Sequence, residues 1–288
     1  MSSFVDAIKR KAGKILSMLP PRVAHSLIYF RNHGRRLNWV MPSTYDEKIH
    51  WCLARKYVEG YSRYADKFRV RDYVAQNGLG SLLIPLYGVY TDAKMIDFES
   101  LPDSFILKTT HGSGLDFYEI CRNKSDLDVD RVRDKMNRAL QVDYSTYQCE
   151  YQYAGISPRI VCEKLLCEGN GARVDDYKVI CTNGKPEAIL LCTERSAGLD
   201  YYSLDWTPLE YTKPSYQSGQ VRQKPAVLEE MLAAAETLSR PFPLSRIDFY
   251  VANSRLWFGE ITLSPAAGNH RNLTSLGQHQ LGLGMVTR

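Results

Sequence analysis

The sequence has no apolar run long enough to cross a membrane as a helix. Its longest runs, such as residues 189–192, are far shorter than the roughly 20 residues that such a helix needs. Near the N-terminus, charges interrupt the apolar positions, and no small-residue cleavage site follows them. We therefore expect neither a transmembrane helix nor a signal peptide, and we predict a cytoplasmic protein.

Paired cysteines and regularly spaced histidines are also missing. The seven cysteines are an odd number, are scattered along the chain and include no Cys-x-x-Cys pair. The six histidines show no His-Glu-x-x-His spacing, and the nucleophile motif Gly-x-Ser-x-Gly is absent. We expect reduced, mostly buried thiols, and neither a disulfide framework, a structural zinc site nor a nucleophilic hydrolase.

Excess charge of one sign is absent from most of the chain. The net charge is +5, but residues 1–40 hold eight basic residues and one acid, so the other residues carry −2. A nucleic-acid enzyme more often spreads positive charge over its working face, so we expect no nucleic-acid partner. The 44% of hydrophobic and 24% of charged residues are typical of a globular protein.

The basic N-terminal segment has the pattern of a short amphipathic helix. Basic side chains alternate with apolar residues that recur at helical spacing until Pro20-Pro21. These apolar residues are Val5, Ile8, Ala12, Ile15 and Leu19. Two interpretations stay open. The helix contacts an anionic membrane face or a membrane-bound partner, or it packs on its own domain with solvated lysines.

The rest of the chain predicts helices first and then hairpins of strands. Residues 44–76 have helical patterns, and Asn183-Gly184 is a strong hairpin signal. We expect strands at 82–90, 104–108, 117–121, 159–166, 177–181, 187–193, 245–251 and 256–262, and helices at 130–140 and 225–239. This order predicts an α+β fold with antiparallel sheets.

A lysine precedes a glycine-rich turn at residues 105–114. Lys108 ends an apolar strand, and His111, Gly112, Ser113 and Gly114 follow it. Glycines let a backbone approach a ligand closely and offer N–H groups to an anion. The pattern suits a polyphosphate, although it is not a P-loop, because the lysine precedes the glycines.

Two acidic residues lie on the two arms of the last predicted hairpin. Antiparallel pairing of Arg246-Ile-Asp248 with Glu260-Ile-Thr262 can place Asp248 beside Glu260 on one face. Two carboxylates in apolar strands repel each other unless a cation lies between them. Mg²⁺ with nucleotide phosphates is the natural choice. Arg246 and Thr262 share this face by parity.

A third group of residues surrounds the strand that leaves through Glu163, Lys164 and Leu165. Free backbone groups at such a strand end could recognise a purine edge, and Lys178 could contact a phosphate. An ordinary strand end with a solvated loop is an equally good interpretation of this pattern alone.

Taken in order, these residues resemble an ATP-grasp enzyme. More narrowly, Asp46-Glu-Lys-Ile-His-Trp51, Leu107-Lys-Thr-Thr-His-Gly-Ser-Gly114, Asp176-Tyr-Lys178 and Gly259-Glu-Ile-Thr262 resemble the TupA-like ATP-grasp family of bacterial cell-surface polysaccharide genes. The resemblance implies two α/β subdomains with antiparallel sheets that clasp the nucleotide. We place a basic extension at 1–40, a helical region at 41–100 and the ATP-grasp body at 101–288, divided near residue 160.

The resemblance implies ligation of a carboxylate to an amine through an acylphosphate, with ATP and Mg²⁺. Lys108 and Lys178 would bind phosphates, with His111 and the glycine loop beside them, and residues 163–165 would hold adenine. Asp248, Glu260 and Thr262 would hold Mg²⁺. Arg246 and Lys108 would be the catalytic residues, and Arg246 would stabilise charge during the reaction. Thr262 stands where many ATP-grasp enzymes have Asn.

The implied substrates are a sugar uronate and an amino acid or small amine of a bacterial surface polysaccharide. The opposite polarity, in which the amino acid supplies the carboxylate, stays open. The substrate contacts would come from Arg195, Ser264 and Gly268, and Glu168 is a candidate for the ribose. The basic N-terminus would hold the enzyme near the inner membrane.

Two other functions stay open. Asp126-Leu-Asp128-Val-Asp130 contains the Asp-x-Asp pattern of metal-dependent glycosyltransferases, but Asp is also the ordinary cap of the helix expected there. The second is a non-catalytic ATP-grasp-like binding protein. The presence of all four main site residues argues against it: Lys108, Arg246, Asp248 and Glu260.

Overall fold

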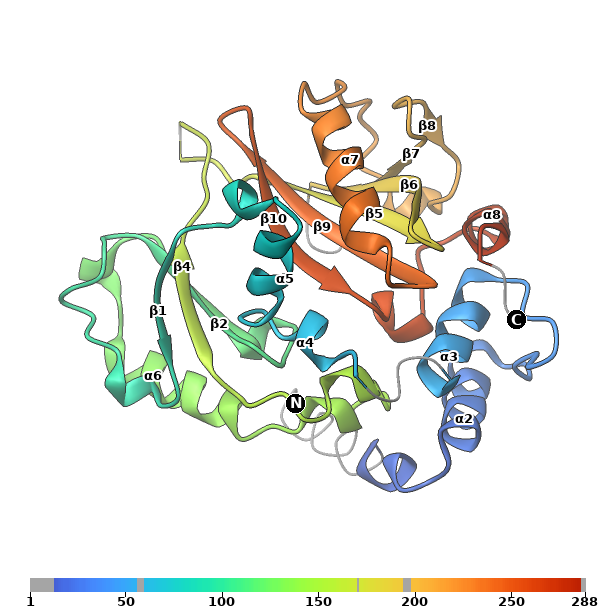
Figure 1. Ribbon diagram of the computed structural model, residues 1–288, viewed down its shortest axis with the longest axis horizontal. Helices are drawn as coiled ribbons and strands as arrows, with labels where there is room; N and C mark the ends of the chain where they lie inside the picture. Colours follow the sequence, from blue (N-terminus) through green and yellow to red (C-terminus); the bar gives the residue numbers. More distant parts are fainter. Residues whose placement is uncertain (1–12, 56–59, 170, 194–197, 286–288) are drawn as a thin grey trace.

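The strands form two antiparallel sheets (Figure 1), in a computed structural model that describes residues 13–55, 60–169, 171–193 and 198–285. The four-stranded sheet has the order β1-β4-β2-β3, and the six-stranded sheet has the order β10-β9-β5-β6-β7-β8. The predicted α+β fold with antiparallel sheets is confirmed. The two sheets with their covering helices supply the two sides of the site described below.

The four-stranded sheet lies against helix α6 (Val129–Leu140). Its strands are β1 (Leu86–Tyr90), β2 (Phe105–Thr109), β3 (Tyr118–Cys121) and β4 (Ile160–Lys164). Along β2, Phe105 and Leu107 are buried in the core that α6 shares. Because side chains alternate along a strand, Ile106 and Lys108 point from the opposite face.

The six-stranded sheet carries helix α7 (Leu228–Ser239) (Figure 1). Its strands are β5 (Asp175–Thr182), β6 (Lys185–Cys192), β7 (Leu199–Tyr202), β8 (Pro208–Leu209), β9 (Leu244–Ala252) and β10 (Arg255–Thr262). On β9, Ile247 and Phe249 enter the main core together with α7. The same alternation turns Arg246 and Asp248 to the other face.

Both predicted hairpins are present. Asn183 and Gly184 join β5 to β6, and Asn253 and Ser254 join β9 to β10. All four residues have positive φ, as a two-residue type I′ turn requires. Helix α7 begins three residues later than the predicted start at Pro225, whose carbonyl accepts a hydrogen bond from the Leu228 N–H in a preceding turn.

Helices precede the sheets and close the chain. They are α2 (Pro21–His33), α3 (Tyr45–Arg55), α4 (Ser62–Ala65), α5 (Val70–Gln76) and α8 (Ser275–Leu283). The helices expected within 44–76 are confirmed. The first helical stretch ends at residue 17, before Pro20-Pro21, as predicted. A second helix that the sequence analysis did not predict, α2, then begins at Pro21, where proline is well tolerated.

The amphipathic helix predicted before Pro20 lies only partly within the described residues. Residues 13–17 are helical, whereas residues 1–12, which hold the rest of that prediction, are outside them. No helix in the described part of the chain is both long and apolar enough to cross a membrane. All seven cysteines are free, and all except Cys167 are buried, as predicted.

Candidate active site

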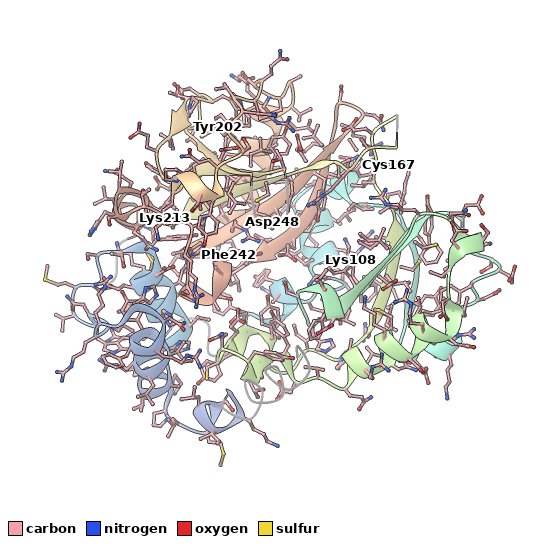
Figure 2. The ribbon with its side chains drawn as sticks, turned by 180° about the vertical axis from the view of Figure 1, so that it is seen from behind. Lys108, Cys167, Tyr202, Lys213, Phe242 and Asp248 are labelled. Carbon is pink, nitrogen blue, oxygen red and sulfur yellow. The ribbon has the colours of Figure 1, made fainter. Side chains whose placement is uncertain are left out.

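A cleft of about 690 Å³ lies between the two sheets and is lined by residues of both. Lys108 on β2 and Asp248 on β9 come from its two sides (Figure 2). This volume falls in the range of small-molecule sites, roughly 300–1,000 Å³. Eleven of the predicted site residues line the cleft: Lys108, Gly112, Ser113, Gly114, Glu163, Lys164, Leu165, Lys178, Arg246, Asp248 and Glu260.

Charged residues face one another across three adjacent strands on the six-stranded side. Asp248 on β9 lies opposite Glu260 of β10 on one side and opposite Lys178 of β5 on the other. The prediction that the two acids are neighbours across paired strands is confirmed. The Lys178 ammonium donates to Asp248 Oδ2 at 2.7 Å. Arg246 contacts both oxygens of Asp248 at 2.6 Å, through Nε and Nη2.

The two carboxylates already share a cation in this structure. Arg246 Nη2 lies 2.6 Å from Asp248 Oδ2 and 3.6 Å from Glu260 Oε1. The sequence argument that two carboxylates need an intervening cation therefore holds, but a guanidinium of the chain itself stands in that place. This arrangement keeps Asp248, whose side chain is only 3% exposed, in a compensated environment.

Glu260 is held ionised by its neighbours. Burial works to raise its pKa, but Lys67, Arg246 and Lys178 outweigh this effect and lower the pKa to about 2. Thr262 donates a hydrogen bond to Glu260 Oε1 at 2.8 Å, and Lys67 Nζ lies 3.7 Å from Oε2. Glu260 thus presents a full negative charge at neutral pH.

Asp176 adds a third carboxylate beside Lys178. Their charged atoms, Oδ2 and Nζ, lie 2.5 Å apart. Burial is the largest influence on the Asp176 pKa and raises it, the charge of Asp248 adds to this, and Lys178 opposes it. The other oxygen, Oδ1, is buried and makes no hydrogen bond within the described residues. Asp176 lines the cleft, so this oxygen is a candidate ligand contact.

An ion triad forms the four-stranded side of the cleft. Glu163 accepts from Lys108 Nζ at one oxygen and from Arg71 Nη1 at the other, both at 3.0 Å. Arg71 also donates to the Ile84 carbonyl at 2.9 Å. Leu165 lies just beyond the end of β4, where strand pairing stops, and so suits recognition of a ligand by backbone groups.

The glycine-rich loop between β2 and β3 needs glycine at two positions. A Cβ on Gly112 would lie 2.0 Å from the ring of Phe117, and Gly114 has a φ of +97°. Lys67 Nζ donates to the Gly112 carbonyl at 2.8 Å, which ties the loop to the segment after α4. Residues 112–115 of this loop are themselves part of the cleft lining.

Several predicted site residues do not line the cleft. His111 is buried, with Nε2 3.1 Å from the Val142 carbonyl, and burial chiefly lowers its pKa. Ser264 is buried and donates to Glu150, and Gly268 packs against the ring of His50. The structure therefore does not place these three residues in contact with a ligand in this cleft. Thr262 stands behind Glu260, Glu168 lies outside the lining, and Arg195 is outside the described residues.

The motif at residues 46–51 is also away from the cleft. It forms most of the buried helix α3. Asp46 Oδ1 lies 2.6 Å from His270 Nδ1, and Oδ2 accepts from Gln278 Nε2 at 2.6 Å. These contacts join α3 to α8 and to the segment after β10, so the motif has a structural role.

The sequence analysis missed Lys67 and Arg71, and it quoted Asp176 within a motif without giving it a role. Lys67 and Arg71 lie in a segment whose pattern indicates only helices, so no local signal marks them. Asp176 could have been found, because it shares strand parity with Lys178. The chain brings Lys67 to Glu260 across almost 200 residues, which only the folded structure reveals.

The residues present fit a Mg²⁺ ion that is bound together with phosphates. Mg²⁺ takes oxygen ligands and usually binds through one or two carboxylates plus a substrate. Glu260, whose side chain is 32% exposed, offers carboxylate oxygens to the cleft. Both oxygens of Asp248 are engaged by Arg246 and Lys178, so an ion held by Asp248 as well would replace one of these contacts. Within the described residues, no group of three or more His, Cys, Asp or Glu forms a self-sufficient metal site.

Comparison with known proteins identifies the family. The family model described as TupA-like ATPgrasp matches residues 47–283, which is most of the chain. The chain belongs to the TupA-like ATP-grasp family. The cleft residues from both sheets lie inside the matched range, and the basic residues before Asp46 lie outside it.

Several solved structures are similar to this TupA-like ATP-grasp protein. The D-alanine–D-alanine ligase from Bacillus anthracis is 15% identical with a TM-score of 0.43, over 75% of this chain and 61% of that one. The L-amino acid ligase from Bacillus licheniformis is 11% identical with a TM-score of 0.46, over 84% and 54%. The chain thus spans less than two thirds of the length of either protein. No curated protein matches it.

Proposed function

We propose that this protein is an ATP-dependent carboxylate–amine ligase. The observation that carries the proposal is one cleft in which cations from both sheets, Lys108 and Lys178, face a strand pair bearing Asp248 and Glu260. ATP would phosphorylate a carboxylate, giving an acylphosphate and ADP. An amine would then attack the acyl carbon, forming an amide and releasing phosphate and a proton.

Each side of the cleft has a task in this proposal. Lys108 and Lys178 bind phosphate oxygens, and the backbone of Gly112, Ser113 and Gly114 covers them. The strand end at 163–165 holds the adenine by backbone groups. Phosphoryl transfer depends mainly on positioning and on neutralising charge, which is what fixed lysines on two sheets provide.

Arg246 is the proposed catalytic residue. Its guanidinium is anchored by Asp248 at 2.6 Å, so it is oriented before any substrate arrives. It would stabilise the charge on the acylphosphate and on the tetrahedral oxyanion. Asp248 and Glu260 would hold Mg²⁺ with Thr262 close behind them, and the ion would supply further neutralisation of the phosphates.

The proposed substrates are a sugar uronate and an amino acid or small amine in bacterial surface polysaccharide synthesis, in the cytoplasm. The family resemblance is the support for this class of substrates, and it fits either partner supplying the carboxylate. Arg195 stays the candidate for pairing with a substrate carboxylate. Ser264 would act on the substrate only indirectly, since its hydroxyl is engaged with Glu150.

The Asp-x-Asp run that suggested a glycosyltransferase has a structural role. Asp128 is the N-cap of α6, and its side chain accepts from the Arg131 N–H at 3.0 Å. Asp126 is likewise engaged with the side chains of Asn123 and Ser125. The predicted capping role of this acidic run is confirmed, and these aspartates lie outside the cleft lining.

Calorimetric titration of ATP with and without Mg²⁺ tests the proposal, with a nucleotide sugar as the comparison ligand. We expect Mg²⁺ to tighten ATP binding in the wild type, and we expect Glu260→Gln to lose that dependence. Glu119→Gln is the matched control, because Glu119 is also paired with cations but lies on β3 outside the cleft lining.

The same variants then enter an assay of ADP release with uronates and amines. Glu260→Gln should lower the rate by about 100-fold or more, as loss of one charge-stabilising group does. Nucleotide-sugar binding without ATP binding would overturn the ligase proposal. An unchanged Mg²⁺ dependence in Glu260→Gln would reject the metal role alone.

A further inference from the structure

Exposed apolar side chains concentrate near the start of the described chain. Among the described residues, 14 large hydrophobic side chains are exposed, and seven of them fall within residues 13–43. They are Ile15, Met18, Val23, Leu27, Phe30, Val40 and Met41. Scattered exposed apolar residues need no explanation, whereas a concentrated group marks an interaction surface.

Three of these side chains form a stripe along α2. Val23, Leu27 and Phe30 follow the spacing of one helical face and are 46%, 49% and 56% exposed. The opposite face, which includes Ala24 and Ile28, is buried against Cys149 and its neighbours. The helix is therefore fixed to the protein on one side and presents an apolar stripe on the other.

Basic side chains flank the stripe, and acids are absent. Residues 13–43 contain five basic residues, namely Lys14, Arg22, Arg31, Arg35 and Arg36, and no Asp or Glu. Arg35 is paired with Glu47 of α3 at 2.9 Å, which leaves four for this surface. At helical spacing, Arg22 and Arg31 fall on the two sides of the stripe. The residues from 44 onward carry a net charge of −2, so the positive charge belongs to this surface.

The loop after α2 adds an aromatic residue at the same place. Trp39 Nε1 donates to Ser26 Oγ at 2.8 Å, and the Arg22 guanidinium lies 5.2 Å from the centre of its ring. These contacts hold the loop against α2, and the next residues, Val40 and Met41, are 86% and 74% exposed. An anchored Trp beside apolar and basic side chains is typical of a membrane interface.

We propose that this surface, made of the stripe, residues 39–41 and the flanking basic residues, docks onto an anionic lipid membrane. Apolar side chains would enter the interface while the arginines meet lipid phosphates. Charge favours lipid over a second copy of the chain, because a two-fold contact would set the four positive charges left for this surface, those of Lys14, Arg22, Arg31 and Arg36, against four.

The surface differs from the helix that the sequence indicated. Leu19, one of the apolar residues of that predicted helix, packs against the cluster of Ala24, Ile28 and Cys149, so it is not available to a membrane. The docking surface lies instead mainly on α2 and the loop after it. The inference concerns location and does not depend on the reaction proposed above.

Vesicle sedimentation of the full-length protein tests the inference. We expect co-sedimentation with vesicles of phosphatidylcholine and phosphatidylglycerol in equal parts, little with phosphatidylcholine alone, and weakening at higher salt. The double variant Leu27→Glu/Phe30→Glu should bind about 100-fold more weakly, given the apolar area of two side chains. Arg22→Gln/Arg36→Gln should lose about fivefold for each arginine.

The matched control is Met95→Glu/Val221→Glu, which adds the same charge at two exposed apolar residues elsewhere. Only long-range charge repulsion should weaken its binding to anionic vesicles, so its affinity should stay within about twofold of that of the wild type. Equal losses in both double variants, or no binding by the wild type, would overturn the inference. So would a dimer, seen by light scattering, that Leu27→Glu/Phe30→Glu dissociates. ATP binding by every variant reports separately on the proposed function.

Discussion

Two carboxylates in and near the cleft have pKa values that are shifted in opposite directions. Cations around the partly exposed Glu260 outweigh the effect of its partial burial and lower its pKa to about 2. Burial raises the pKa of Glu150 to about 7, and the hydrogen bond from Ser264 only partly offsets it. The difference lies in the neighbours, which are three cations in one case and a neutral hydroxyl in the other.

Glu150 therefore predicts a pH-dependent stability. Its pKa is raised on folding, so its favourable contribution is present below about pH 4.5 and is lost as pH rises through about 7. We expect Glu150→Gln to become progressively more stable than the wild type between pH 5 and pH 8, by on the order of 2 kcal/mol. Denaturant unfolding at several pH values measures this difference.

Glu99→Gln is the control, because it removes the same charge from an exposed position. The free-energy difference between that variant and the wild type should stay nearly constant with pH. If Glu150→Gln behaves in the same way, the carboxyl of Glu150 is solvated in solution and the prediction is wrong.

At the scale of single residues, the sequence predicted roles that follow from local patterns, such as the alternation of side chains along a strand. Lys108, Asp248 and Glu260 were found because strand parity assigns each side chain to a face, and Asp128 was interpreted correctly because capping is local. The contacts of Lys67 and Ser264 could not be predicted from the local sequence. The partners of each, Glu260 and Glu150 respectively, are more than 100 residues away in the sequence.

At the scale of elements, the β2–β3 loop depends on Gly112. A methyl group there would overlap the ring of Phe117, which is itself buried at 5% exposure and packs near Tyr144. We expect Gly112→Ala to displace the loop, to lower the free energy of unfolding by about 1–3 kcal/mol, and to weaken ATP binding. Thermal unfolding and ATP titration check both effects.

Gly80→Ala serves as the comparison. Gly80 lies in a short helical turn, and a Cβ there would meet Ala75 only at 3.8 Å, an ordinary contact. This variant should be neutral or slightly stabilised. Similar losses in both variants would mean that backbone freedom rather than the clash with Phe117 matters at Gly112.

The sequence predicted elements best where a hairpin turn or a long periodic run marked them. Asn183-Gly184 located β5 and β6, but the four-residue β7 and the two-residue β8 carry too little pattern to be seen. Helix α2 was missed because two prolines suggest an end, although Pro21 opens it. Such short or proline-led elements are stabilised by tertiary packing that the local sequence does not contain.

At the scale of the whole molecule, the cleft exists because distant segments approach from two sheets. Lys67, in the segment between α4 and α5, contacts the glycine loop of one sheet and faces Glu260 of the other. Arg71, near the start of α5, holds Glu163 of the four-stranded sheet, while Val70 and Val74 pack in the core of the six-stranded sheet. The segment thus joins the two halves.

A nucleotide bound between the sheets should stabilise the chain through both. Ligand bound to the folded state raises stability in proportion to the logarithm of ligand concentration over Kd. Lys108→Met on β2 should therefore lose most of the rise in unfolding temperature that ATP and Mg²⁺ produce. Without nucleotide the loss should be modest, since Arg71 still compensates Glu163. Lys185→Met, at an exposed lysine of β6, should keep the full rise. If Lys108→Met also keeps it, the nucleotide binds the six-stranded sheet alone, and the cleft does not clasp it.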